Sequence, residues 1–296
     1  MSKAYRAGLP APSPPSLYEA WEQFKAERSL SLQPTTLASD YRQVSQWLER
    51  CPVQELEDGR KVLLWVLGQQ PVLSARKVCM FVRGLYRWAS SEDVGILARN
   101  PVLNFKMPKA PQKQHEVRVI PRDEIGLVLI ALEHKTHHRA INWSLFAEFM
   151  LQTAMRTGEV RAMKWTDIRD GKLLVHSNYT LTHGHKKSTK TNKQRVVPLN
   201  LRAQEILASV PRDNDYVFPW NRSSFQSHFR NKIDQLHDYQ LIRDRYRPYD
   251  LRHVAISRWL EAGIPVAQVA RWAGNTAEVI WNHYANATTD YEVPVL

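Results

Sequence analysis

Residues 249–253 have the sequence Tyr249-Asp250-Leu251-Arg252-His253, and Tyr284 follows Arg252 by 32 residues. An arginine is suited to holding a phosphodiester, because its guanidinium stays charged and can bind two oxygens at once. A tyrosine can attack the phosphorus of the group so held. The pattern also predicts a helix over residues 251–262, which would fix the arginine near a helix start. Together these features indicate chemistry on a phosphodiester.

Two further segments lie upstream of this one. Residues 152–160 place Arg156 after an apolar helix end, and Glu159 follows at a spacing that lets its carboxylate reach the same turn. Residues 186–199 contain a basic, turn-like run with Lys190, followed by an expected strand. In this order, the segments resemble the catalytic domain of the tyrosine recombinases, also called the phage integrase family.

The resemblance implies a role for each of these residues. Arg156 and Arg252 would clamp the phosphate, and Glu159 would support the site. Lys190 would reach the cleaved bond from a hairpin and protonate the departing 5′ oxygen, since expelling an alkoxide near neutral pH is unfavourable. Tyr284 would be the nucleophile.

Each of these residues also has an ordinary structural alternative. Most arginines and lysines are solvated surface residues, and Lys193 competes with Lys190 for the role of the acid. Most tyrosines are packed aromatics, but Tyr284 lies nine residues after Asn275, in the family's spacing, whereas Tyr291 fits no spacing. A free phenol has a pKa of ~10, so ionising it at pH 7 costs roughly 4 kcal/mol. We expect the two arginines to offset part of that penalty.

Two positions depart from the family's common pattern. The family usually has histidine where this chain has Tyr249, and histidine or tryptophan where it has Asn275. A phenol and an amide can each donate a hydrogen bond to a phosphate oxygen, but neither transfers protons as an imidazole does at neutral pH. We therefore expect slower proton transfer with an intact charge clamp. His253 and His283 each lie one residue away from a motif position, and we expect them to be packing or supporting groups.

The composition of the whole chain restricts its partners and its compartment. The 296 residues carry a formal charge of +12 with a pI near 9.7, which favours nucleic acid as the partner, then an acidic membrane. Cys51 and Cys79 show no metal-ligand spacing, which argues against a structural zinc or a disulfide framework and favours a reducing cytosol. The longest apolar runs are too short to cross a membrane. We expect a cytoplasmic protein without membrane contact.

The first part of the chain predicts a small helical domain. Residues 1–15 are rich in proline and lack an apolar stretch, so we expect a disordered leader and not a signal peptide. Residues 16–107 contain helical patterns over 17–28, from Pro34 onward, over 55–67 and over 74–89, and Asn100-Pro101 ends the helical structure. These residues resemble the core-binding domain of the same family, a helical clamp on one face of duplex DNA. The short leader leaves no room for an arm-binding domain, so the resemblance implies the two-domain type.

The rest of the chain predicts a linker, a catalytic domain and a tail. Residues 108–118 are basic and broken by proline, so this linker could follow the DNA backbone or act as an ordinary tether. Residues 119–285 are the expected catalytic domain, and residues 286–296 are the tail. The domain has strand patterns over 172–176, 179–182 and 195–197, and helical patterns over 124–132, 138–155, 201–209, 223–236, 251–262, 266–272 and 277–283. The predicted fold is mainly α, with one small antiparallel sheet.

The resemblance implies a site-specific DNA recombinase or integrase. Tyr284 would form a 3′-phosphotyrosyl bond and release a 5′ hydroxyl, and the 5′ hydroxyl of a partner strand would reverse the step. The covalent link would conserve the bond energy, so the reaction needs no cofactor, ATP or metal. The family acts as a homo-tetramer on two sites in double-stranded DNA and passes a C-terminal segment between neighbours, here residues 285–296. The sequence leaves open any accessory DNA-bending or directionality factor.

Two alternatives to a recombinase remain at this point. A type IB topoisomerase uses the same tyrosine chemistry as a monomer, although the helical amino-terminal domain favours a recombinase. A DNA-binding relative could have weak or lost cleavage. The sequence leaves open the DNA target, the direction of the reaction and the host element.

Overall fold

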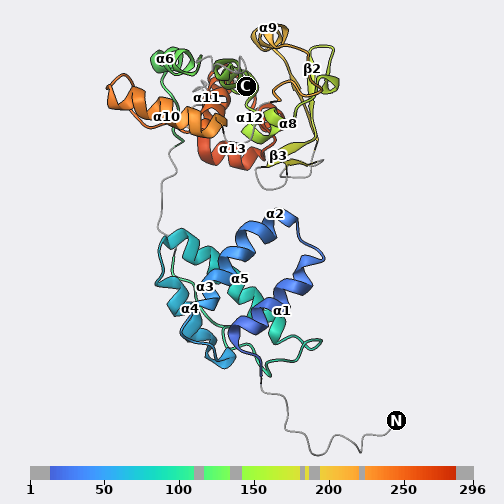
Figure 1. The fold of residues 1–296 in the computed structure, drawn as a ribbon, viewed down its shortest axis with the longest axis vertical. Helices are drawn as coiled ribbons and strands as arrows, with labels where there is room; N and C mark the ends of the chain where they lie inside the picture. Colours follow the sequence, from blue (N-terminus) through green and yellow to red (C-terminus); the bar gives the residue numbers. More distant parts are fainter. Residues whose placement is uncertain are drawn as a thin grey trace, which may run out of the picture. The chain divides into compact units, whose positions relative to one another are not determined.

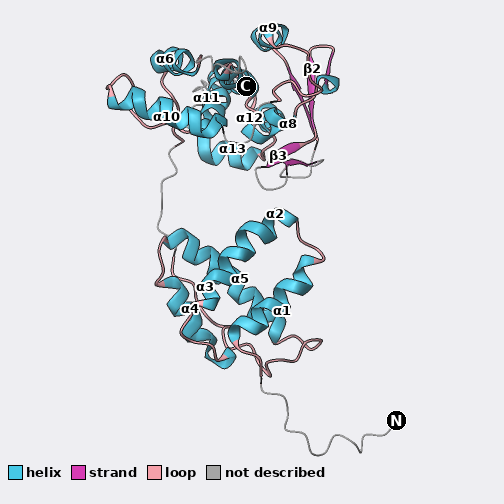
Figure 2. Cartoon of the chain, in the orientation of Figure 1, coloured by secondary structure: helices cyan, strands magenta, loops and turns pink. Residues whose placement is uncertain are grey.

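The computed structural model describes residues 14–109, 117–133, 142–180, 184–186, 194–219 and 224–284. The chain forms two compact units, residues 1–113 and 114–296 (Figure 1), so the division falls within the predicted linker. Helices predominate in both units (Figure 2). Lys190, Lys193, most of the predicted leader and the predicted tail lie outside the described residues.

The amino-terminal unit begins with helix α1 (Leu17–Ser29). It starts with a capping box: the Ser16 side-chain oxygen accepts from the Glu19 backbone N–H, and the Glu19 carboxylate accepts from the Ser16 backbone N–H at 2.8 Å. The other elements of this unit are α2 (Pro34–Thr36), the π-helical segment η2 (Leu37–Tyr41), α3 (Arg42–Glu49), the 3₁₀ turn η3 (Leu56–Asp58), α4 (Gly59–Leu67) and α5 (Val72–Ala89). The predicted second helix is therefore one helical run with a π segment inside it.

The core of the amino-terminal unit is apolar and rich in aromatic residues. Trp21 stacks on Tyr41 with ring centroids 5.1 Å apart, and its indole nitrogen donates to Ser45 Oγ at 2.8 Å. Gly59 lies where α4 passes Tyr86, and a Cβ at this glycine would lie 2.8 Å from the Tyr86 ring. Only glycine allows this approach, so the first turn of α4 is fixed against the core.

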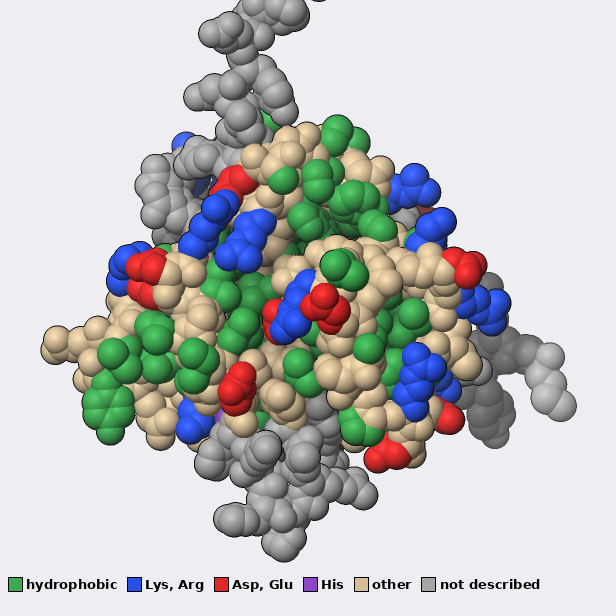
Figure 3. Space-filling view, turned by 90° about the horizontal axis from the view of Figure 1, so that it is seen from above, with side chains coloured by type: hydrophobic (Ala, Val, Ile, Leu, Met, Phe, Trp, Pro, Cys, Tyr) green, Lys and Arg blue, Asp and Glu red, His purple; other side chains and the backbone are tan. Residues whose placement is uncertain are grey.

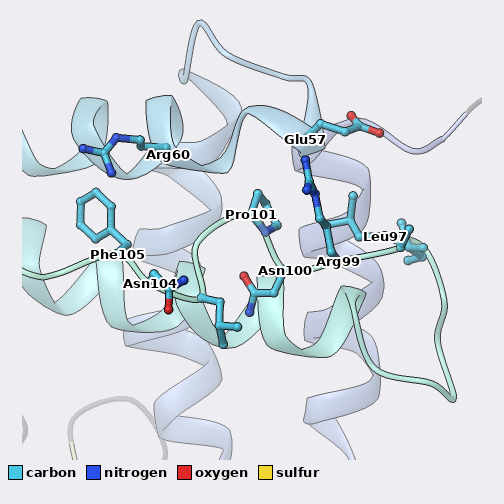
Figure 4. A pocket seen from close by; sticks show the side chains of 11 residues that line it. Glu57, Arg60, Leu97, Arg99, Asn100, Pro101, Asn104 and Phe105 are labelled. Atoms are coloured by element: carbon cyan, nitrogen blue, oxygen red, sulfur yellow. The ribbon is translucent and has the colours of Figure 1, made fainter.

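A hollow of about 850 Å³ opens beside the segment that follows α5 (Figure 4). The Arg60 guanidinium lies over the Phe105 ring at 5.8 Å from its centroid, and Arg99, Asn100 and Leu97 also line the hollow. All of its lining residues belong to the amino-terminal unit. None of the described residues predicted for catalysis lines this hollow.

The carboxy-terminal unit is built on helices with one three-stranded sheet. Its helices are α6 (Arg122–Leu132), α7 (Trp143–Thr153), α8 (Thr157–Ala162), α9 (Leu201–Ser209), α10 (Ser224–Asp238), α11 (Pro248–Glu261), α12 (Val266–Ala273) and α13 (Ala277–Tyr284), with the 3₁₀ turn η4 at Trp165–Asp167. The predicted helix over 138–155 ends earlier, at Thr153, because Ala154 adopts the left-handed conformation with φ 50°. Residues 138–141 lie outside the described part.

The strands form two ladders instead of the single predicted sheet. Strands β1 (Ile168–Arg169), β2 (Lys172–Val175) and β5 (Arg195–Pro198) make an antiparallel sheet in the order β1-β2-β5. Leu173 pairs with Val197, and both are buried, as the alternation of side chains requires. The strand predicted over 179–182 is β3 (Asn178–Thr180), and it pairs with β4 (Gly184–Lys186) in a separate hairpin. The prediction of one sheet was wrong in this respect, because alternation within a strand does not identify its partner.

Two apolar clusters support the carboxy-terminal unit. The larger one joins the sheet to α7, which packs against α11, and includes Phe146, Phe149 and Leu251. The smaller one joins Ala154 to α11, α12 and α13, and includes Ile256 and Tyr284. Arg156, Arg252, Asn275 and Tyr284 therefore lie at or near the ends of helices that these clusters hold in place.

Charge on the described surface is mixed. Figure 3 shows a face on which Lys and Arg side chains lie close to Asp and Glu side chains. Arg202, for example, donates to Glu148 at 2.7 and 2.8 Å and to Glu205 at 3.0 Å. Among the helices that the structure describes, none combines the length and the apolarity needed to cross a membrane.

Candidate active site

Arg156 and Glu159 lie at the start of α8. The left-handed turn at Ala154 ends α7, and Arg156 is the residue that caps α8. The Arg156 backbone N–H donates to Glu159 Oε2 at 2.9 Å, and Arg156 Nη1 donates to Glu159 Oε1 at 3.0 Å. The three-residue spacing predicted this contact. Gly158 brings α8 against β3, since a Cβ there would lie 2.1 Å from Asn178 Oδ1.

Arg252 is fully buried near the start of α11. Its Nη1 donates to the Ala154 carbonyl and its Nη2 donates to the Ala273 carbonyl at 2.7 Å. Both carbonyls lie at the C-terminal end of a helix, where the helix dipole favours a positive charge. Arg252 Nε has no hydrogen-bond partner among the described residues. The Arg252 guanidinium therefore links α11 to the ends of α7 and α12. Its Nε–H donor remains available for a ligand.

Asn275 connects the two arginines. Its Oδ1 accepts from Arg156 Nη2 at 3.0 Å and from Arg252 Nη2 at 3.1 Å. Gly274, with φ 68°, ends α12 in the left-handed conformation and places Asn275 between the guanidiniums. The donor of this amide is Nδ2, so Nδ2 is the atom that could donate to a phosphate oxygen while Oδ1 holds the two guanidiniums. The structure thus brings Arg156, Arg252, Glu159 and Asn275 into one cluster.

Arg195 belongs to the same cluster and was missed at the sequence level. Its Nη1 and Nη2 donate to the two carboxylate oxygens of Glu159 at 3.0 and 2.6 Å, and its Nε donates to the Trp272 carbonyl at 2.8 Å. It also packs against Gly274, where a Cβ would lie 3.0 Å from its side chain. The sequence could have indicated this position, because Arg195 lies two residues before Val197 and therefore shares the buried face of β5.

The Glu159 carboxylate is held in its charged form. Burial by itself would raise its pKa, but hydrogen bonds and charge from Arg195, together with the charge of Arg156, lower the pKa of Glu159 to about 2. Glu159 therefore stays ionised at neutral pH and orients two guanidiniums at once. Its role in supporting the site stays a prediction.

Tyr284 is the last residue of α13 and is 5% exposed. Its phenolic oxygen is hydrogen-bonded to His253 Nδ1 at 2.5 Å. Burial raises the pKa of the Tyr284 phenol above its usual value, and the charge of Arg252 only partly opposes this. Arg252 therefore offsets part of the cost of ionising the Tyr284 phenol, as expected, but burial outweighs this offset.

His253 lies against the Tyr284 phenol, a contact that the sequence did not predict. It was expected to be a packing or supporting group, but it follows Arg252 directly and contacts the oxygen of Tyr284. Burial, followed by the charges of Arg252, Arg247 and His283, lowers the pKa of His253 to about 4. The imidazole is therefore neutral at pH 7 and can accept a hydrogen bond through Nδ1.

Tyr249 completes the described part of the site. It is 42% exposed at the start of α11, with its ring edge-on to His253 at 4.9 Å and near the Arg252 guanidinium at 5.9 Å. Its predicted role as a donor to phosphate stays a prediction. The same holds for Lys190 as the acid, since Lys190 lies outside the described residues.

The sequence profile described as "Phage integrase family" matches residues 118–290, which is more than half of the chain. This chain belongs to the phage integrase family. The tyrosine recombinase family that the motifs predicted is therefore confirmed. The match contains Arg156, Glu159, Arg252 and Tyr284.

Two relatives of this phage integrase family member carry recombinase names. The shufflon-specific DNA recombinase of Escherichia coli is 32% identical over 198 residues, which are 65% of this chain and 45% of that protein. The putative integrase/recombinase y4eF of Sinorhizobium fredii (strain NBRC 101917 / NGR234) is 27% identical over 191 residues, which are 62% of this chain and 69% of that protein. The match thus spans less than half of the E. coli recombinase.

Solved structures of integrases share the fold. The Tn1549 transposon integrase in complex with transposon right end DNA matches with a TM-score of 0.71 at 13% identity, over 91% of this chain and 94% of that one. A lambda integrase dimer bound to a COC′ core site matches with a TM-score of 0.71 at 18% identity, over 94% and 80%. A lambda integrase tetramer bound to a Holliday junction gives 0.68 at 19% identity, over 88% and 77%. These likenesses confirm the predicted mainly α fold with a small antiparallel sheet.

Proposed function

We propose that this protein is a site-specific DNA recombinase that cleaves and rejoins DNA through a covalent bond to Tyr284. The observation that carries the proposal is that Asn275 Oδ1 accepts hydrogen bonds from both Arg156 and Arg252. His253, the residue after Arg252, contacts the Tyr284 phenol. Guanidiniums held by protein groups suit an anionic phosphate, because they need no rearrangement as charge develops. Family membership supports the same reaction class.

The reaction follows from the chemistry of these groups. The Tyr284 oxygen attacks phosphorus, the bond from phosphorus to the 5′ oxygen breaks, and a 3′-phosphotyrosyl bond forms. Arg156 and Arg252 stabilise the charge that develops on the non-bridging oxygens. Lys190 protonates the departing 5′ oxygen. Attack by the 5′ hydroxyl of a partner strand then reverses the step and releases the tyrosine.

Asn275 and Tyr249 take positions where the family usually has other side chains. Asn275 serves the site by holding two guanidiniums together, which an amide oxygen can do and a protonated imidazole cannot. Tyr249 offers an exposed hydroxyl as a donor to the phosphate. Both substitutions preserve the positive charge of the site, so we infer an active enzyme.

The partners that we propose are two double-stranded DNA sites and other copies of this chain. The lambda integrase structures with the same fold include a tetramer on a Holliday junction. A homo-tetramer of this protein on DNA, with residues 285–296 passed between neighbours, is the corresponding assembly. An accessory DNA-bending or directionality factor stays a prediction.

A nicked suicide substrate tests the proposal. Nicked duplexes tiled from the DNA that flanks the coding gene are incubated with the protein and separated on a denaturing gel. We expect a DNA-linked protein band that is lost in Tyr284→Phe. Relaxation of any supercoiled plasmid without a preferred site would favour a type IB topoisomerase instead. Sequence-specific binding without a covalent band in the parent protein would mean a DNA-binding relative that has lost cleavage.

A further inference from the structure

The contact between His253 and Tyr284 joins two helices at the reacting atom. The two residues are 31 positions apart, on α11 and α13, and His253 Nδ1 lies 2.5 Å from the Tyr284 oxygen. Their ring centroids are 5.6 Å apart, and His253 also contacts the Tyr249 ring. The imidazole is thus held on two sides by aromatic rings and faces the phenol with one nitrogen.

We propose that His253 is the base that accepts the proton of the Tyr284 phenol during DNA cleavage. This inference rests on the proposed function. As the bond from the phenolic oxygen to phosphorus forms, the O–H bond breaks and the proton moves to His253 Nδ1, which gives an imidazolium. The 5′ oxygen takes a different proton, from Lys190, as its bond to phosphorus breaks. In the rejoining step the imidazolium returns its proton to the phenolic oxygen, which is then the leaving group.

Other groups of the described site are unsuited to this role. The Glu159 carboxylate is buried and bonded to Arg195 and Arg156, and its pKa is lowered to about 2. Asn275 Oδ1 is engaged by the two guanidiniums, and an amide is not a base at neutral pH. The Tyr249 side chain is itself a phenol, which is protonated at neutral pH and so does not act as the base. The histidine that the family usually has at that position is absent, and His253 supplies an imidazole four residues later, one turn along α11.

The charges around His253 explain how it could act only when DNA is bound. Arg252 and Arg247 on α11 and His283 on α13 all disfavour the imidazolium, in addition to burial, and lower the pKa of His253 to about 4. The imidazole is therefore unprotonated at neutral pH and can receive a proton. A bound phosphate would bring negative charge to the same guanidiniums, and so stabilise the imidazolium as the proton arrives.

The test measures covalent adduct formation by His253→Phe and His253→Gln on two substrates. One is the ordinary nicked duplex and the other has sulfur in place of the bridging 5′ oxygen, so that its leaving group needs no proton. We expect both variants to form adduct on the order of 100-fold more slowly than the parent on either substrate. Lys190→Ala should be slow on the ordinary substrate and regain most of its rate on the sulfur substrate. His237→Gln, a change at a histidine of α10 that is not among the groups acting on His253, should stay close to the parent.

The pH dependence separates a base from a packing residue. Without His253 the phenol must ionise unaided, so the rate of the variants should rise about tenfold per pH unit between pH 7 and 9, while the parent rate stays nearly flat. Parent-like rates in both variants, or a defect that the sulfur substrate removes, would overturn the role. DNA binding by each variant is measured in parallel, and a loss of rate that matches a loss of binding would also count against it.

A second measurement does not depend on cleavage. In the ¹⁵N-histidine-labelled full chain, the Nδ1 resonance of His253 should be that of an unprotonated acceptor at pH 7, and it should shift in Tyr284→Phe. An unchanged resonance would contradict the contact and the inference with it. If the contact is present but the parent forms no adduct on any DNA, the proposed function fails, and the role of His253 as a base fails for that reason alone.

Discussion

At the scale of single residues, the site is held together by Glu159. One carboxylate accepts from Arg156 and from both terminal nitrogens of Arg195, in a nearly water-free position. The spacing of Arg156 and Glu159 in the sequence predicted the first contact. The second was not predicted, because the partner lies 36 residues away and only the inward position of Arg195 on its strand indicates it.

Replacing Arg195 should therefore destabilise the carboxy-terminal unit. Arg195→Ala leaves the buried Glu159 carboxylate with one arginine and removes a donor to the Trp272 carbonyl, so we expect the free energy of unfolding to fall by about 3 kcal/mol. Urea unfolding followed by fluorescence measures it. Arg202→Ala is the matched control, since Arg202 is an exposed arginine with two carboxylate partners, and it should change the stability little. Equal effects of the two changes would contradict the account.

The lowered pKa of Glu159 predicts a stability that depends on pH. The carboxyl titrates near pH 4.5 in the unfolded chain and near pH 2 in the folded chain, so its contribution is fully present above about pH 4.5 and is lost as the pH falls to 2. We expect a loss of about 3 kcal/mol over this range that is absent in Glu159→Gln. The check is the free energy of unfolding at several pH values for both proteins. Parallel curves would show that folding does not lower the pKa of Glu159.

At the scale of helices and strands, the ends of elements build the site. The left-handed residues Ala154 and Gly274 end α7 and α12, and the carbonyls of Ala154 and Ala273 then accept from Arg252. Apolar periodicity predicted most of the helices and two of the three sheet strands. It could not predict the end of α7, because an alanine in a left-handed conformation has no local sequence signal and is imposed by tertiary packing.

Two glycines in helices should respond oppositely to alanine. Gly158 on α8 lies against β3, where a Cβ would meet Asn178 Oδ1 at 2.1 Å and the Tyr179 carbonyl at 2.6 Å, whereas Gly126 on α6 has nothing within 4 Å of such a Cβ. We expect Gly158→Ala to lower the free energy of unfolding by about 2 kcal/mol. Gly126→Ala should raise it by about 0.5 kcal/mol, because alanine is the better helix former.

Thermal unfolding of the two variants and the parent tests this pair. A Gly158→Ala protein as stable as the parent would mean that α8 and β3 do not pack as described. A Gly126→Ala protein that is less stable than the parent would mean that other residues pack against this face of α6.

At the scale of the whole molecule, the order of motifs along the chain predicts the fold, whereas the contacts within the candidate site depend on tertiary packing. The order of motifs predicted the family and the mainly α fold, and both are confirmed. His253 contacts Tyr284, which lies 31 residues further along the chain. Arg252 donates to the carbonyl of Ala273, which lies 21 residues further along. Such contacts depend on how α11, α12 and α13 pack around a shared apolar cluster, which the spacing of residues along the chain does not specify.

The excess of positive charge predicts binding to DNA that depends strongly on salt. With a formal charge of +12, several phosphate contacts would release counterions, so we expect the affinity for duplex DNA to fall roughly 1,000-fold between 50 and 200 mM salt. Fluorescence anisotropy with a labelled duplex measures this. An affinity that barely changes with salt would argue against a backbone-tracking DNA-binding protein.

The central claim is that Tyr284 is the residue that becomes bonded to DNA, and mass spectrometry of the trapped adduct tests it most directly. Cleavage after Arg271 by trypsin leaves one peptide, residues 272–296, that contains both Tyr284 and Tyr291. After nuclease digestion, fragmentation of this peptide shows which tyrosine carries the nucleotide. The account predicts the added mass on Tyr284 and none on Tyr291. A nucleotide on Tyr291, on another residue, or on no residue of the parent protein would contradict it.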